Sequence, residues 1–319
     1  MIAAFSSFLC NATWAQWSPE KTTEMIVTAG PGGNQDQTAR MIQQLWQIKK
    51  ITSSPVVVIN KPGGGGGIAA NYISQHAEDP HYMMMLAPTL MTSRISGTNK
   101  VDYTDYTPLA MLFTESIYVS VRMDSPIKNG KDFIQTLRKN PDSLSIAVAS
   151  AIGNHIHMGV ALPMKAAGVD IKRMKFVAFK SSGQSMVSLL GGHVDVAAST
   201  FGTLLPHVKA GKIRIIGVSA PQRMTGILAN IPTWKEQGAN AVFDSWRGVV
   251  GAKGITEEQK AYWEQAFAEL CKSEEWEKDI EKNFRVNSYL NGKDARRYWD
   301  AQYKDLEEAL TDLGLAKAR

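Results

Sequence analysis

The chain has few of the features that mark disulfide-linked, membrane-spanning or nucleic-acid-binding proteins. Only Cys10 and Cys271 are present, and removal of a leader after Ala15 would leave one cysteine and no disulfide within the chain. No apolar run is long enough to span a bilayer. Lys and Arg do not gather in a dense run with interleaved aromatic residues, so we expect no nucleic-acid partner.

Charge is missing from the first sixteen residues, which contain no Lys, Arg, Asp or Glu. This apolar segment ends in Thr13-Trp14-Ala15-Gln16, with small residues at the positions that a signal peptidase reads. The basic start of a secretory signal is absent. We therefore interpret residues 1–16 as a signal peptide whose start is trimmed or misassigned, with an apolar tail as the alternative.

Signatures of catalytic and cofactor chemistry are absent as well. The chain has no H-E-x-x-H, no G-x-S-x-G and no G-x-x-x-x-G-K-[ST]. A dinucleotide fingerprint that begins at Gly63 fails because Ile68 stands at its third glycine position. His155 and His157 are two residues apart on an expected helix and point to different faces, which argues against a shared metal ion. We predict no catalytic residue, no cofactor and no metal.

Strand-like and helix-like segments alternate along the 319 residues, a pattern typical of an α/β protein with mainly parallel sheets. The length is enough for two domains. The chain passes from one α/β block to the other near 117–123 and returns near 243–250. We therefore predict two lobes with a cleft between them. The first lobe is expected to comprise residues 17–120 with 247–319, and the second residues 121–246.

Two glycine-rich turns are the strongest functional signal. Residues 30–36 follow the apolar run 25–29, and the glycine run Gly63–Gly67 follows the apolar run 56–59. A strand that ends in such a turn and opens a helix directs backbone N–H groups and the positive end of the helix dipole outward. Two of these turns side by side predict a site for an anion, and the net charge of +5 suits one.

The second block contains turns in equivalent positions. The turn 150–155 follows the expected strand 144–149, and the turn 180–183 follows the expected strand 175–179. Ligands of open α/β sheets bind beyond the carboxyl ends of the strands. We therefore expect these turns to face the glycine-rich turns across one cleft, with His155 as a candidate donor to a ligand carboxylate.

Two acidic residues lie nearest to the expected cleft. Asp36 falls in the first turn of its helix, where the dipole favours a carboxylate. Its carboxylate could accept from a water, hold the facing loop, or only stabilise the helix. Asp195, which follows Gly191-Gly192-His193-Val194, is interpreted as fixing a loop. Asn34 and Gln37 have the spacing of a capping box.

Several ordered motifs, running from Trp17 to the C-terminal part of the chain, resemble the Bug family. These proteins are the extracytoplasmic solute receptors of tripartite tricarboxylate transporters. The motifs are Trp17-Ser18-Pro19, Pro31-Gly32-Gly33-x-x-Asp36-x-x-Ala39-Arg40, Asn60-Lys61-Pro62-Gly63-x-Gly65-Gly66, Tyr106-Thr107-Pro108, Gly153-Asn154-His155, Gly191-Gly192-x-Val194-Asp195, Gly211-Lys212-Ile213-Arg214 and Ile231-Pro232-Thr233-x-x-Glu236-x-Gly238.

The resemblance implies a type II periplasmic binding fold, with two α/β lobes joined by two crossover strands. It also implies a periplasmic receptor that captures a small mono- or dicarboxylate and delivers it to the permease subunits of a membrane transporter. We expect a monomer. The ligand-binding residues implied by position are Pro31, Gly32, Gly33, Asp36, Gly64, Gly65, Ala87, Thr89, Ser150, Asn154, His155, Ser181, Ser182 and Asp195.

The chain departs from the family pattern at two places. It has Asp79-Pro80-His81-Tyr82 where the family usually has a glycine-containing motif. Ser181 replaces a glycine that often lines the pocket, so neither an aliphatic nor an aromatic ligand is favoured. Two alternatives stay open at this point: a two-lobed enzyme that acts on a carboxylate, and a receptor that signals to a sensor partner.

Overall fold

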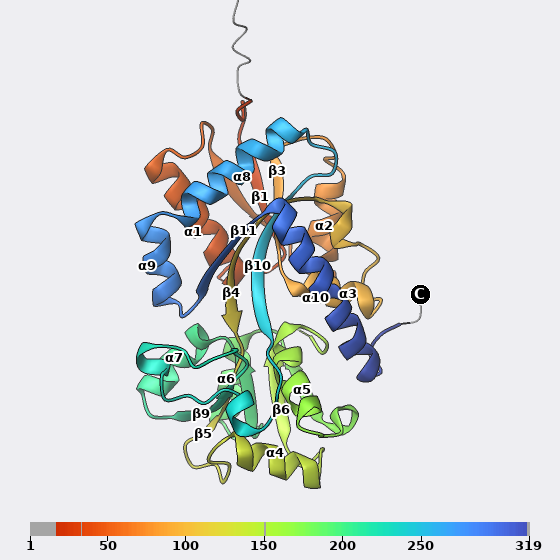
Figure 1. Cartoon of the computed structure of the whole chain (residues 1–319), viewed down its shortest axis with the longest axis vertical. Helices are drawn as coiled ribbons and strands as arrows, with labels where there is room; N and C mark the ends of the chain where they lie inside the picture. The colour runs from red at the N-terminus through yellow and green to blue at the C-terminus, as the bar shows by residue number, and fades with distance from the viewer. Residues whose placement is uncertain (1–16, 33, 150, 318–319) are drawn as a thin grey trace, which may run out of the picture.

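The computed structural model describes residues 17–32, 34–149 and 151–317. They form two α/β lobes, each built around its own sheet and stacked along the long axis of the molecule (Figure 1). The expected signal peptide lies outside the described residues. Within those three ranges, no helix combines the length and the apolar character needed to cross a bilayer.

The first lobe contains a six-stranded sheet with the order β11-β4-β10-β3-β1-β2. Strands β1, β2 and β3 are parallel, whereas β10 runs antiparallel to β3 and β4. The carboxyl ends of β1 to β4 and the start of β10 therefore share one edge. The strands are β1 (Thr23–Val27), β2 (Val56–Asn60), β3 (Tyr82–Leu86), β4 (Thr107–Ser116), β10 (Asp244–Gly251) and β11 (Val286–Asn291).

Helices cover both faces of this sheet, with α1, α8 and α9 on one side and α2, α3 and α10 on the other (Figure 1). Trp46 of α1 stacks on Trp263 of α8 at 5.8 Å between ring centroids, and both rings are fully buried. The helices are α1 (Asn34–Lys49), α2 (Gly67–Ser74), α3 (Pro88–Ile95), α8 (Glu257–Cys271), α9 (Glu274–Lys282) and α10 (Gly292–Asp312).

The second lobe contains a five-stranded sheet with the order β7-β6-β8-β5-β9. Strand β5 enters from the first lobe and runs antiparallel to β8 and β9, while β6 is parallel to β7 and β8. The carboxyl ends of β6 to β9 therefore point back toward the first lobe. The strands are β5 (Tyr118–Arg122), β6 (Ser145–Ala149), β7 (Lys175–Phe179), β8 (Val196–Ser199) and β9 (Ile213–Val218).

Four helices complete this lobe, with α6 and α7 on one face of the sheet and α5 on the other (Figure 1). Two separate apolar clusters lie on the two faces, one with Phe133 and Trp234, the other with Leu189 and Leu204. The helices are α4 (Gly130–Lys139), α5 (His155–Ala166), α6 (Ser182–Leu190) and α7 (Phe201–Lys209).

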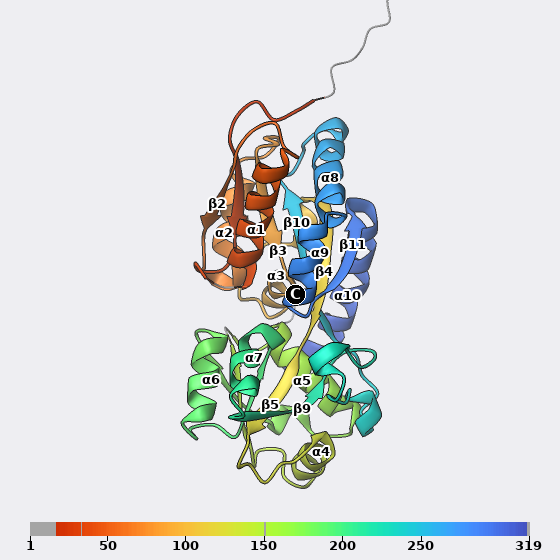
Figure 2. The same ribbon diagram turned by 90° about the vertical axis from the view of Figure 1, so that its left-hand side faces the viewer.

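Two chain segments and one helix connect the lobes (Figure 2). Strand β4 leads directly into β5 through Ile117, and the returning chain enters β10 after Phe243. The hydroxyl of Ser219 accepts from the Ile117 amide and donates to the Phe243 carbonyl, which ties the two segments together. Helix α10 also reaches the second lobe, where Asp312 pairs with Lys165 of α5.

The α/β architecture with two lobes confirms the fold predicted from the sequence. The limits proposed for the lobes, 120/121 and 246/247, stay predictions. In the structure the second sheet begins at Tyr118 and the first sheet resumes at Asp244.

Candidate functional site

The carboxyl edges of the two sheets face each other, and the turns that follow their strands lie between the lobes. The turn 30–32 joins β1 to α1, and Gly63–Gly66 joins β2 to α2. The two turns are tied together, because Asn60 donates to the Ala29 carbonyl at 3.0 Å and the Lys61 amide donates to Val27 at 2.9 Å. The structure thus brings the two predicted glycine-rich turns side by side.

Asp36 is the residue that holds these turns together. One carboxylate oxygen accepts from the Gly32 amide at 2.8 Å and from Arg40 Nε at 3.0 Å. The other accepts from the Asn60 amide at 2.8 Å and pairs with Arg40 Nη2 at 3.0 Å. Burial alone would raise the pKa of Asp36, but these partners outweigh it and hold the pKa below its usual value. Of the roles considered for this carboxylate, the structure therefore supports holding the loop.

The glycine run adopts a backbone that side chains oppose. Gly63, Gly64, Gly65 and Gly66 all have positive φ, between 58° and 118°. A Cβ atom added to Gly65 would lie 2.0 Å from the hydroxyl of Ser93. The turn is therefore packed against α3 with no space for a side chain at Gly65.

Replacing Gly65 by alanine is expected to lower the free energy of unfolding by about 1–3 kcal/mol, because it combines positive φ with a close contact. Gly168 is the matched control, since its φ of +75° is similar but no atom lies within 4 Å of an added Cβ. Urea unfolding of the two variants measures the difference. An equal loss in Gly65→Ala and Gly168→Ala would contradict the packing argument.

The end of β3 meets the second lobe directly. Ala87 is buried and precedes α3, and Thr89 lies in the first turn of that helix. The hydroxyl of Thr89 lies 3.3 Å from Nδ1 of His155, the first residue of α5. Burial, followed by the nearby charge of Arg247, lowers the pKa of His155 to about 3. His155 is therefore neutral and can both donate and accept hydrogen bonds between the lobes.

The turn after β6 is stabilised from within. Asn154 is buried, accepts from the His157 amide at 3.0 Å and donates to the Ala149 carbonyl. Its side chain therefore caps α5 and closes the turn, and the expected ligand contact at Asn154 stays a prediction. Ser150 and Gly33, which were predicted to contact the ligand, lie outside the described residues.

His157 packs inside the second lobe. Its Nδ1 accepts from the Gly153 amide at 2.9 Å, so the ring carries its proton on Nε2. The ring packs edge-on against the ring of Phe176, with 4.0 Å between the two ring centroids. Burial lowers the pKa of His157 to about 4, and protonation of Nδ1 would break the bond to Gly153.

Lowering the pH from about 6.5 to 4 is therefore expected to destabilise the protein. In this window the unfolded chain binds a proton at His157 that the folded chain does not. The free energy of unfolding therefore decreases as the pH is lowered. The contribution of His157 is up to about 3 kcal/mol over the whole window. Urea midpoints measured across this range should fall less steeply in His157→Leu, and identical slopes would contradict the prediction.

Ser181 and Ser182 follow β7 and begin α6. The hydroxyl of Ser181 caps this helix by accepting from the Gln184 amide at 3.3 Å, and Ser182 is its first residue. Ser181 is exposed. The carboxyl end of β7 lies on the edge of the second sheet that faces the first lobe, as predicted for this turn.

Asp195 does not join the other predicted residues. It precedes β8, and its carboxylate accepts from the amide and the hydroxyl of Ser145 at 2.8 Å and 2.6 Å. Ser145 is the first residue of β6. Because β6 and β8 are parallel, Asp195 lies at the edge of the sheet opposite the cleft. We therefore correct its assignment as a ligand contact, while its role in fixing a loop agrees with the sequence interpretation.

A buried charged network at the cleft edge was missed in the sequence. Glu115 of β4 pairs with Arg247 of β10 at 2.6 Å, and only 4% and 3% of these side chains are exposed. Asn34 donates to both oxygens of Glu115, at 3.1 Å and 2.9 Å, and accepts from Arg285 at 2.8 Å. The spacing of Asn34 and Gln37 had indicated a capping box, but Asn34 serves this network instead.

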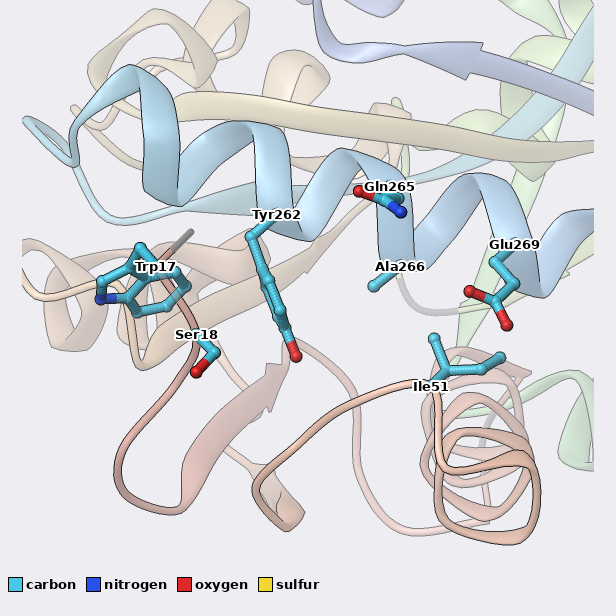
Figure 3. Close-up of a pocket in the computed structure, with 7 residues that line it drawn as sticks. All are labelled: Trp17, Ser18, Ile51, Tyr262, Gln265, Ala266 and Glu269. Atoms are coloured by element: carbon cyan, nitrogen blue, oxygen red, sulfur yellow. The ribbon is translucent and has the colours of Figure 1, made fainter. Parts of the chain in front are cut away.

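A separate hollow lies on the outer side of the first lobe (Figure 3). It has a volume of about 220 Å³ and borders α8 and the beginning of the described chain. None of the predicted site residues that the structure describes lines it, and the carboxylate of Glu269 on its wall disfavours an anion. The lining residues are Trp17, Ser18, Ile51, Tyr262, Gln265, Ala266 and Glu269.

The arrangement between the lobes suits binding better than chemical conversion. Helices α1, α2, α3, α5, α6 and α7 follow strands that end at the facing edges, so their positive dipole ends point toward the space between the lobes. Among the residues that the structure describes, no group of His, Cys, Asp and Glu could hold a metal ion. The fold and this site define a two-lobed solute-binding protein.

A family model described as the tripartite tricarboxylate transporter family receptor matches residues 38–315. The chain therefore belongs to this family of receptors, which confirms the resemblance found in the sequence. The family consists of solute receptors rather than enzymes, so the chain is a receptor and the enzyme alternative is set aside.

Similar proteins cover nearly the whole chain. A UPF0065 protein from Cupriavidus necator is 26% identical over 304 residues, covering 94% of this chain and 90% of its own length. Among solved structures, Rpa4515 of R. palustris with adipate has a TM-score of 0.82, at 24% identity, covering 93% and 99% of the two chains. MatC of Rhodopseudomonas palustris with bound malate has a TM-score of 0.72, at 21% identity, covering 92% and 98%.

Proposed function

We propose that this protein is a periplasmic receptor that captures a small organic carboxylate between its lobes and delivers it to the permease subunits of a tripartite tricarboxylate transporter. The observation that carries the proposal is the position of the two glycine-rich turns. They lie side by side at the end of β1 and β2, opposite the helix starts of the second lobe. Backbone N–H groups at such helix starts bind anions.

Family membership and the named ligands of two similar structures support this proposal. The family description names tricarboxylate transport, and the similar structures were solved with adipate and malate, both dicarboxylates. The proposed ligand contacts are the predicted residues that face the cleft edge in the structure, together with two predicted residues that lie outside the described ranges. They are Pro31, Gly32, Asp36, Gly64, Gly65, Ala87, Thr89, Asn154, His155, Ser181 and Ser182, with Gly33 and Ser150.

Binding is expected to close the lobes about the two connecting segments, at Ile117 between β4 and β5 and after Phe243 at the start of β10, without converting the ligand. Unfolding and refolding frees the protein of co-purified ligand. Calorimetry of this protein against a panel of aliphatic and aromatic carboxylates then tests capture. Small-angle scattering with and without the tightest binder tests closure, and mass analysis of the recovered ligand tests that it is unchanged. If none of the carboxylates in the panel binds, the proposal is overturned.

Delivery requires a separate measurement. Deletion of the gene is expected to abolish uptake of the bound carboxylate by the intact cell, and loss of uptake should be restored by the full chain. Fractionation of the cells is expected to place the protein in the periplasm. Unchanged uptake would separate capture from transport and favour a sensing role.

A further inference from the structure

Arg247 carries an N–H group for which the described part of the chain supplies no acceptor. Its guanidinium is buried, with Nη2 paired to Glu115 at 2.6 Å. Nη1 donates to the hydroxyl of Ser245 at 2.9 Å and to the Trp246 carbonyl at 2.8 Å. Nε has no hydrogen-bond partner among the described residues. Because a buried N–H of a charged group is strongly unfavourable without an acceptor, a further acceptor is expected at this atom.

Two contacts place Arg247 beside the proposed cleft. Glu115, its partner, also accepts from Asn34 at the start of α1, next to the turn 30–32. From the other lobe, helix α5 contacts β10, the strand of Arg247. The positive charge of Arg247 accordingly adds to burial in lowering the pKa of His155, the first residue of α5. Arg247 thus lies on a connecting strand, between the first-lobe turns and the start of α5.

The second arginine of the network is placed differently. The guanidinium of Arg285 lies 4.5 Å from the ring centroid of Phe113, and its Nη1 pairs with Asp279 at 3.2 Å. Its Nε also lacks a hydrogen-bond partner among the described residues, but unlike Arg247 Nε it faces the Glu115 carboxylate, at 4.0 Å. Arg285 therefore has two carboxylates and an aromatic ring from the first lobe around it, and it serves as an internal control for Arg247.

We propose that Arg247 Nε–H receives the second carboxylate of a dicarboxylate ligand, and that Arg247 determines the preference of the receptor for dianions. This inference rests on the proposed function. The first carboxylate is held by the backbone N–H groups of the turns, and the second forms a charge-assisted hydrogen bond with Arg247. A monocarboxylate of equal length leaves this buried N–H unpaired, so the site rejects it.

The test compares ligands that differ only in the second carboxylate. Calorimetry with adipate and hexanoate, and with succinate and butyrate, gives the dianion preference of each variant. Arg247→Gln is expected to weaken dicarboxylate binding by about 10–100-fold, the effect of losing a hydrogen bond to a charged group. The same variant should change monocarboxylate binding by less than about threefold. Arg247→Lys, which keeps the charge but not the Nε position, should lose most of the preference.

Each outcome decides the proposal. Arg285→Gln disturbs the same network and is expected to keep the dianion preference. If it weakens dicarboxylates as Arg247→Gln does, or if Arg247→Gln weakens both ligand classes equally, Arg247 is only structural and the inference is overturned. Binding of monocarboxylates without dicarboxylates would overturn the inference and leave the proposed function intact. Binding of no carboxylate would overturn both.

Discussion

Replacing Glu115 by alanine is expected to lower the free energy of unfolding by about 3–5 kcal/mol, the effect of removing one partner from a buried ion pair. Glu115 is the carboxylate on which Arg247, Arg285 and Asn34 converge. Its loss leaves the buried guanidinium of Arg247 without a counter-charge. Because Glu115 lies on β4, the effect falls on a strand that connects the lobes.

Urea unfolding followed by tryptophan fluorescence measures this loss. Asp124 is the matched control, because it also pairs with an arginine, Arg122 at 2.9 Å, but 37% of the Arg122 side chain and 73% of the Asp124 side chain are exposed. Exposed pairs contribute about 0–1 kcal/mol, so Asp124→Ala should change stability little. Equal losses in the two variants would show that burial of the Glu115 pair is not what makes it important.

Replacing Asp36 by alanine is expected to have the second large effect, on stability and on binding together. The variant loses an ion pair and leaves the Gly32 amide and the Asn60 side chain without their acceptor. A loss of about 2–4 kcal/mol follows from hydrogen bonds to a charged group. The bonds from Asn60 to Ala29 and from Lys61 to Val27 would remain, but the turn 30–32 would lose its own anchor through the Gly32 amide. Carboxylate affinity should therefore fall by at least about tenfold, since misplaced donors bind weakly.

Asp36→Asn separates charge from shape. The asparagine keeps the size of the side chain but turns one acceptor into a donor, which faces the amide of Gly32 or Asn60. We expect it to lose most of the stability that the alanine variant loses. The pKa of Asp36 is lowered, so the contribution of its charge is complete above the usual carboxyl pKa and is lost as the pH falls through the folded value. Full stability in Asp36→Asn would contradict this account.

Much of the fold could be predicted because local signals agreed with one another. The runs 25–29 and 56–59 are continuous and apolar, as expected for strands buried on both faces, and β1 and β2 pair in parallel at these positions. Thr256 and Gln259 have the spacing of a capping box, and both of its hydrogen bonds form at the start of α8. Trp263, Phe267, Leu270 and Cys271 recur at helical spacing, and all four are buried on one face of α8.

The site could be predicted only where backbone geometry made it. Glycine runs are typical of turns, so the loops of the first lobe could be predicted from their composition. Asp195 was misplaced, because a glycine-rich turn looks the same at either end of a strand and only the pairing of β6 with β8 shows which end it occupies. Arg247 and Glu115 were missed because they lie 132 positions apart (247 − 115) on different strands, and nothing local indicates that they meet.

The order of the strands sets how far each part of the site travels when the lobes move. Arg247 lies on β10, one of the connecting strands, whereas the Gly63–Gly66 turn follows β2, the third strand along from β10. At the usual distance between neighbouring strands, the turn lies about 14 Å from β10, so it moves further than Arg247 when the lobes rotate. Ser181, after β7, is equally remote from the connecting strand β5. An anion is thus expected to meet Arg247 early, while the lobes are open, and to be enclosed last at the rim. Salt and charge at Arg247 should then govern the rate of capture, and the rim should govern the rate of release.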